Sequence, residues 1–120
     1  MTAPPYDADR FEREWQGDLD VLRSLAESGD RPEIPRMIDV SFRGSVEALA
    51  ALARRASDFG FTVMDRDTSG DDEPWLFLER FSTADEETIR DLTMTCLRIE
   101  QVFGVERDGW GCIGQTGSVQ

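Results

Sequence analysis

Lysine, histidine and asparagine are missing from this sequence of 120 residues, and all 13 of its basic residues are arginines. Without histidine the chain can form no Ser-His-Asp triad and no imidazole metal ligand, and without lysine it has no side-chain amine for a Schiff base. No nucleophile stands beside a general base in the sequence. We therefore expect a protein that is not an enzyme, with no catalytic residue, no metal site and no cofactor.

Cysteine is scarce, and long apolar runs are absent. The two cysteines, Cys96 and Cys112, form no Cys-x-x-Cys pair, so a reducing compartment is the simpler interpretation. Pro4, Pro5 and Asp7 stand where a signal peptide would need basic and then apolar residues. No apolar run reaches the length of a membrane span. These features predict a cytoplasmic protein that does not contact a membrane.

Positive charge is also in short supply, because 25 acidic residues give a net charge of −12 and a pI near 4.3. Nucleic-acid backbones and anionic lipids attract arrays of basic residues, so we expect no direct binding to nucleic acid. Hydrophobic residues make up 39% of the chain, which is enough for one core at this length. The sequence therefore predicts one small acidic domain that works by binding a protein partner.

Hydrophobic periodicity predicts three helices and four strands. The helices are expected at 7–28, 45–59 and 83–103, and the strands at 36–42, 61–64, 75–81 and 105–108. Ser45 is the expected N-cap of the second helix, and Thr83 with Glu86 forms a capping box for the third. Gly60 suits the left-handed position after the second helix, and Gly104 ends the third.

This order of elements is typical of an α+β, ferredoxin-like two-layer sandwich, a βαββαβ fold with a four-stranded antiparallel sheet and here an extra N-terminal helix. Strands 36–42 and 75–81 are the most apolar and are expected at the centre of the sheet. We divide the chain into an N-terminal helix and linker at 1–35, a ferredoxin-like domain at 36–112 and a flexible tail at 113–120.

The aromatic residues of strand 75–81 should project from the side of the sheet that faces away from the connecting helices. They are Trp75, Phe77 and Phe81. Our first expectation is that the N-terminal helix covers them with its own apolar residues, Phe11, Trp15 and Leu19. The alternative is an exposed patch that docks a partner, because large apolar patches on proteins usually have a use. Stacking of RNA bases there is disfavoured by the acidic charge.

The segment from Asp65 to Glu73 is polar and acidic. Its first residues resemble a calcium loop, with oxygen ligands at alternate positions and Gly70 at the sixth, but Leu76 stands where that loop needs a glutamate. A solvated hairpin loop is therefore expected. Clustered carboxylates also steer association with a basic partner, which makes this loop a candidate partner-binding site. Its acidic members are Asp65, Asp67, Asp71, Asp72 and Glu73.

A second candidate partner-binding segment is Asp108-Gly109-Trp110-Gly111, directly after the last expected strand. Two glycines permit a sharp backbone turn around one large side chain. Two interpretations stay open. Trp110 can pin the end of the chain onto the core, or the turn can shape a surface that a partner contacts.

Two stretches together resemble a known family. They are Phe-Gly-Phe-Thr-Val-Met-Asp at 59–65 and Phe-Gly-Val-Glu-Arg-Asp-Gly-Trp-Gly at 103–111. With the order of elements over 37–111, they resemble the regulator of ribonuclease activity B family, also called ribonuclease E inhibitors. The resemblance implies a cytoplasmic, non-catalytic protein that binds the non-catalytic C-terminal region of ribonuclease E and slows RNA processing. The alternatives, by fold analogy alone, are a small-molecule sensor or a dimerising domain.

Overall fold

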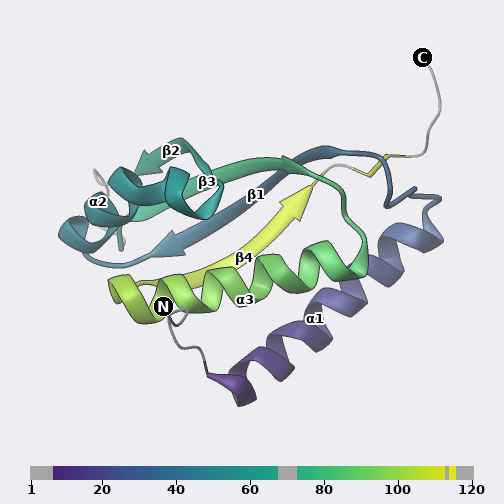
Figure 1. Ribbon diagram of the computed structural model, residues 1–120, viewed down its shortest axis with the longest axis horizontal. Coiled ribbons are helices and arrows are strands. Elements are labelled where there is room, and N and C mark those ends of the chain that lie inside the picture. The colour runs from purple at the N-terminus through teal and green to yellow at the C-terminus, as the bar shows by residue number, and fades with distance from the viewer. Residues whose placement is uncertain (1–6, 68–72, 113, 116–120) are drawn as a thin grey trace.

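A computed structural model of the chain describes residues 7–67, 73–112 and 114–115 (Figure 1). The elements along the chain are α1 (Ala8–Glu27), β1 (Arg36–Arg43), α2 (Val46–Arg55), the 3-10 helix η1 (Ala56–Phe59), β2 (Thr62–Asp67), β3 (Trp75–Ser82), α3 (Glu86–Phe103) and β4 (Glu106–Cys112). No helix in these ranges combines the length and apolar content that a membrane span requires.

The four strands form one sheet in the order β2-β3-β1-β4, and every pair of neighbours is antiparallel. This is the predicted ferredoxin-like arrangement, with the two most apolar strands at the centre. Ile38, Val40 and Phe42 on β1 and Leu76 and Leu78 on β3 point to the same side, where α2 and α3 bury them. The core therefore lies between one face of the sheet and the helices.

The ends of α1 and α2 follow the sequence signals. The Asp7 side chain accepts a hydrogen bond from the Arg10 backbone N–H at 3.0 Å, and Ser45 accepts one from the Ala48 N–H at 3.1 Å. Each cap pairs one of the N–H groups that a helix leaves free in its first turn. Gly60, after η1, has φ 84°, a left-handed conformation that glycine adopts without strain, as predicted.

The cap of α3 differs from the prediction. Asp85, not Thr83, is the N-cap, and its carboxylate accepts from the backbone N–H of Thr88 at 3.1 Å. The Thr83 hydroxyl donates instead to the same carboxylate at 2.5 Å. The predicted capping box was wrong because an aspartate two residues later offers a charged acceptor at the positive end of the helix. Together these hydrogen bonds hold the pKa of Asp85 below its usual value, with the Thr83 hydroxyl as the main cause.

All four strands end later than predicted, β1 and β3 by one residue, and β2 and β4 by more. β2 continues to Asp67 and β4 to Cys112. Asp65 and Asp67 therefore belong to a strand and not to a loop, and the segment 108–111 lies within β4. Asp71 and Asp72 lie outside the described residues.

The prediction that α1 covers the aromatic side of β3 is wrong. α1 lies beside α3, on the helical side of the sheet (Figure 1). Its Phe11 is buried, and Trp15 and Leu22 pack against the core from that side. Leu19 is only half-buried. The position of α1 is determined by polar contacts from Asp18 to α3 and β4, which the apolar pattern of the helix did not show.

The linker before β1 is fixed by a buried ion pair. Arg36 Nη1 lies 2.6 Å from Asp30 Oδ1, and Nη2 of the same side chain donates to the backbone oxygens of Arg31 and Ile34. The backbone N–H of Gln115 also donates to Asp30, at 2.6 Å. The last described residues of the chain are therefore bound to the linker. Of the expected tail, residues 113 and 116–120 lie outside the described residues.

Replacing Asp85 by alanine should lower the free energy of unfolding by about 1 kcal/mol at pH 7, the usual effect of losing such a cap. Because the folded pKa of Asp85 is depressed, its contribution is present above the unfolded pKa of about 3.9 and is lost as pH falls through the folded pKa. The deficit of Asp85→Ala should therefore shrink in urea titrations below about pH 4. Asp91→Ala, on the exposed side of the same helix, is the control. An equal deficit at all pH values would contradict this role of Asp85.

Candidate functional site

The face of the sheet that points away from the helices is the candidate site, and we call it the open face. Burial alternates along β1, whose residues Met37 and Asp39 are exposed between fully buried neighbours. The pairing of the strands extends this side across the sheet. The open face consists of Thr62, Asp65 and Asp67 from β2, Trp75, Phe77, Glu79 and Phe81 from β3, Met37, Asp39, Ser41 and Arg43 from β1, and Glu106, Asp108, Gly109 and Gly111 from β4.

Apolar side chains are exposed at one end of the open face. Phe81 retains 67% of its accessible surface and Met37 retains 46%, and the two are direct cross-strand partners. A phenylalanine and a methionine exposed side by side form an apolar surface that a partner can contact. Our first expectation, that this side is covered, is thereby replaced by the alternative of an exposed aromatic patch.

The other end of the open face holds a stack of rings and one guanidinium. The rings of Trp75 and Phe77 stack with centroids 5.5 Å apart and planes inclined by 20°. The Arg43 guanidinium lies over the Trp75 ring, 3.9 Å from its centroid, and Arg43 Nη2 is 3.6 Å from the carboxylate of Asp108. This end of the face thus binds an arginine through an aromatic ring and an acid together.

Between the two ends, two carboxylates face each other. Asp39 on β1 is the direct partner of Glu79 on β3. Among the described residues no cation forms an ion pair with either of them. Like charges directly opposite each other on neighbouring strands destabilise a sheet. The pair therefore costs stability in the free protein.

Most of the charge on the open face is negative. Its described acidic residues are Asp39, Asp65, Asp67, Glu79, Glu106 and Asp108. Arg43 is the one basic residue among the described members of this face, and it is already paired. Such a surface repels phosphate backbones and attracts cationic segments.

The glycines of the predicted segment 108–111 keep the β4 side of the open face bare. Gly109 has φ 131° at an irregularity where the β1–β4 register shifts, a conformation that side chains rarely adopt. Gly111 is the cross-strand partner of Asp39, and a Cβ atom there would lie 3.4 Å from Asp39 Oδ1. A side chain at 111 would therefore begin in van der Waals contact with the carboxylate of Asp39.

Trp110, between the two glycines, points to the opposite side of the sheet. Its indole N–H donates to Asp18 Oδ1 on α1 at 2.8 Å. Asp18 is buried, and its second oxygen accepts a hydrogen bond from the hydroxyl of Thr93 on α3. The Arg107 guanidinium, also buried, lies 3.4 Å from Asp18 and 3.7 Å from Glu14. One carboxylate thus joins α1, α3 and β4.

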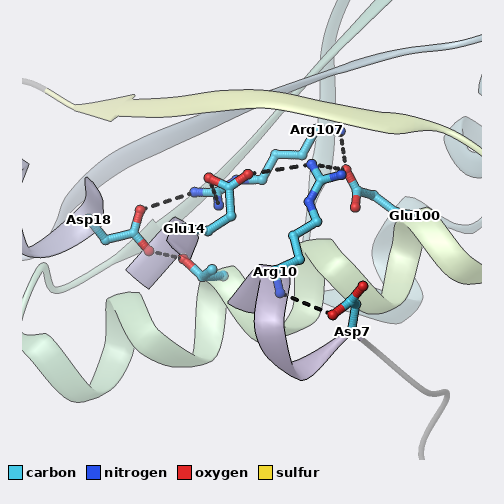
Figure 2. A network of polar contacts seen from close by, with 7 residues as sticks. Asp7, Arg10, Glu14, Asp18, Glu100 and Arg107 are labelled. Carbon is cyan, nitrogen blue, oxygen red and sulfur yellow. Dashed lines mark hydrogen bonds and ion pairs between the residues drawn. The ribbon is translucent and has the colours of Figure 1, made fainter. Parts of the chain in front are cut away.

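Figure 2 shows how this network continues along α1. Glu100 on α3 accepts the backbone N–H of Arg107 at 2.6 Å and the guanidinium of Arg10 at 2.8 Å. Burial raises the pKa of Glu100, while the N–H of Arg107 and the charge of Arg10 act against that rise. The same Arg10 also reaches Glu14 at 3.4 Å. The ion pairs of this network join α1, α3 and β4, and they hold α1 in its position.

The sequence analysis missed Asp18 and Thr93, although a signal was present. Asp18 occupies the helical stripe that otherwise consists of Phe11, Trp15, Leu22 and Leu25. A lone acid on an apolar stripe is buried and needs partners. Of the predicted partner-binding residues, the structure places Asp65, Asp67, Asp108, Gly109 and Gly111 on the open face and Trp110 on the other side. Glu73 is exposed just before β3.

The described residues contain no group of three or more acidic, cysteine or histidine side chains placed to hold a metal ion. Cys96 is fully buried in the core, and burial raises the pKa of its thiol to about 12. A thiol in this setting stays protonated and unreactive.

Comparison with known proteins gives one result for the whole fold. The profile of the family described as Regulator of ribonuclease activity B matches residues 15–112, which is most of the chain. The match begins within α1 and ends with β4, so it includes Asp18, the open face and the segment 108–111. No curated protein matches the sequence.

Replacing Asp18 by alanine should lower the free energy of unfolding by about 3 kcal/mol, because Arg107 would remain buried beside an incomplete set of partners. Asp18→Asn keeps an acceptor for Trp110 and should cost less. Urea unfolding followed by circular dichroism measures both. Asp20→Ala, on the exposed side of the same helix, removes only a surface ion pair with Arg23 and should change little. Equal effects at positions 18 and 20 would show that the network does not hold α1.

Proposed function

The chain belongs to the regulator of ribonuclease activity B family, and on this basis we propose that it inhibits ribonuclease E by binding the non-catalytic C-terminal region of that enzyme. Membership makes it a regulator of ribonuclease activity that acts through contact with the nuclease, in a family that is not catalytic. What we propose beyond family membership is the identity of the nuclease, ribonuclease E, and the region of it that the chain contacts.

The match over residues 15–112 is the observation that carries the proposal. The electrostatics support it independently. A chain with net charge −12 and an acidic open face is complementary to an arginine-rich segment and unsuited to RNA itself. Inhibition is therefore proposed to proceed through the protein partner and not through competition for RNA. We place this interaction in the cytoplasm, where RNA is processed.

Within the contact we assign different tasks to the two predicted segments. Asp65 and Asp67 at the end of β2, with Asp71, Asp72 and Glu73 further along the sequence, provide electrostatic attraction. The segment 108–111 shapes the surface from the β4 side. Its two glycines add no side chains to the open face. Trp110 fixes the strand by its hydrogen bond to Asp18.

Binding in the non-catalytic region leads to a simple expectation for inhibition. The chain does not need to enter the active site. It changes the set of proteins that assemble on the nuclease, and RNA processing slows as a consequence. Full-length ribonuclease E should therefore be inhibited, whereas its isolated catalytic domain should be unaffected.

The purified chain should bind the C-terminal region of ribonuclease E from the same organism, with an affinity that falls steeply as salt is raised from 50 to 300 mM, because exposed charges are screened. Isothermal titration measures the affinity, and cleavage of a labelled RNA by full-length and truncated nuclease measures the inhibition. Absence of a complex at 50 mM salt would overturn the proposal. Equal inhibition of the isolated catalytic domain would also contradict it.

A matched pair of variants tests the acidic end of β2. Asp65→Asn with Asp67→Asn should weaken the complex about tenfold, since charge at an interface rim acts mainly on association. Glu12→Gln with Glu27→Gln removes the same charge from exposed positions of α1 and is the control. Equal weakening by both pairs would show that only the net charge matters.

A further inference from the structure

We propose that the open face binds an arginine side chain of an extended partner segment, with the guanidinium held over the Asp39–Glu79 pair and against the ring of Phe77. This inference rests on the proposed function, because it specifies the chemistry of the partner at the same surface. It assigns a binding role to Asp39, Glu79, Phe77 and Phe81.

The first argument is the uncompensated charge of Asp39 and Glu79. They stand opposite each other on the two central strands, and the described residues provide no cation for either. A cation bound between them would convert a repulsive pair into two ion pairs. Gly111, the cross-strand partner of Asp39 on its far side, presents no side chain to that carboxylate. The site is thus preformed and lacks only its positive charge.

The second argument is the arginine that the chain already holds on this face. Arg43 lies over Trp75 and reaches Asp108, so a ring and a carboxylate together hold its guanidinium. Phe77 stacks on Trp75, and Glu79 is the next residue on the same side of β3 beyond Phe77. A guanidinium bound beside Glu79 would stack on the ring of Phe77, as Phe77 stacks on Trp75. The same chemistry would then occur twice along the open face, once within the chain and once with the partner.

The position of Phe81 adds an apolar contact for the stem of the arginine. Neighbouring same-side residues on a strand are roughly 7 Å apart, so Glu79 stands midway between Phe77 and Phe81. Phe81 and its partner Met37 are both exposed. The methylene groups of a bound arginine can cover them while the guanidinium reaches the carboxylates.

This chemistry selects arginine over lysine. A guanidinium is planar, stacks on rings, pairs with two carboxylate oxygens at once and is more weakly hydrated than an ammonium group. The negative charge of the open face also argues against two other binding partners, RNA and a second copy of the chain. RNA would be repelled by the carboxylates, and a second copy of the chain would present the same negative charge.

Two labelled peptides, octa-arginine and octa-lysine, test this selectivity by fluorescence anisotropy with the full chain at 100 mM salt. We expect octa-arginine to bind about fivefold more tightly, since stacking adds to an equal charge attraction. Phe77→Leu with Phe81→Leu should abolish that preference and leave the lysine peptide nearly unaffected. Equal binding of the two peptides by the unaltered chain would overturn the proposal.

The variants Asp39→Asn and Glu79→Gln provide a second readout that misfolding cannot imitate. Each should weaken octa-arginine binding about tenfold, in line with the loss of one buried charge pairing at an interface. Each should also raise the melting temperature, by about 2 °C, because the repulsion within the pair is removed. The control pair Glu12→Gln with Glu27→Gln should change neither quantity. A lower melting temperature together with unchanged binding would contradict the proposal.

The same variants separate this inference from the proposed function. If the unaltered chain binds the ribonuclease E region and Glu79→Gln binds it equally well, the docking surface is wrong and the function stands. If octa-arginine binds through Glu79 but the nuclease region does not bind at all, the function is wrong and the surface stands. Self-association that disappears in Phe81→Leu, or RNA that displaces octa-arginine, would assign the face to another occupant and overturn the inference.

Discussion

The buried carboxylate of Asp18 is the interaction on which the remainder of this architecture depends. It accepts hydrogen bonds from Thr93 on α3 and Trp110 on β4, and it balances the buried charge of Arg107. A buried acid must be paired, and the partners of Asp18 come from two other elements, so α1 must lie where Asp18 reaches both of them. That place is beside α3. Because α1 is held there, the opposite side of the sheet is left without a covering helix among the described residues.

The segment from Arg107 to Gly111 serves both sides of the sheet at once. Arg107 and Trp110 face the helices and hold α1, while Asp108, Gly109 and Gly111 belong to the open face. The register shift next to Gly109 makes this division possible, because the extra residue reverses the alternation of side chains. Some residues of this stretch therefore hold α1 against the sheet, and the others form part of the open face. The two interpretations left open for Trp110 thus apply to different residues of the segment.

The open face combines features that reduce stability with features that suit binding. Phe81 and Met37 remain exposed, and Asp39 faces Glu79. A sequence selected for stability alone would not place these side chains together on the central strands. Their combination beside the Arg43–Trp75 stack suits the proposed recognition of an arginine-bearing protein by a member of the regulator of ribonuclease activity B family.

The sequence by itself determined the elements, their order and the apolar side of each strand, because periodicity and caps such as Ser45 and Gly60 depend on neighbours along the chain. It also identified the aromatic row of β3 and the acidic residues from Asp65 onward, although it assigned Asp65 and Asp67 to a loop and the structure places them in β2. The site as a whole was not predictable, since the Asp39–Glu79 pair arises only when two strands far apart in sequence come into register. Only the tertiary structure decided that α1 lies beside α3 and leaves the sheet open. That choice depends on hydrogen bonds that one buried carboxylate accepts from residues 75 and 92 positions away, and no local pattern contains them.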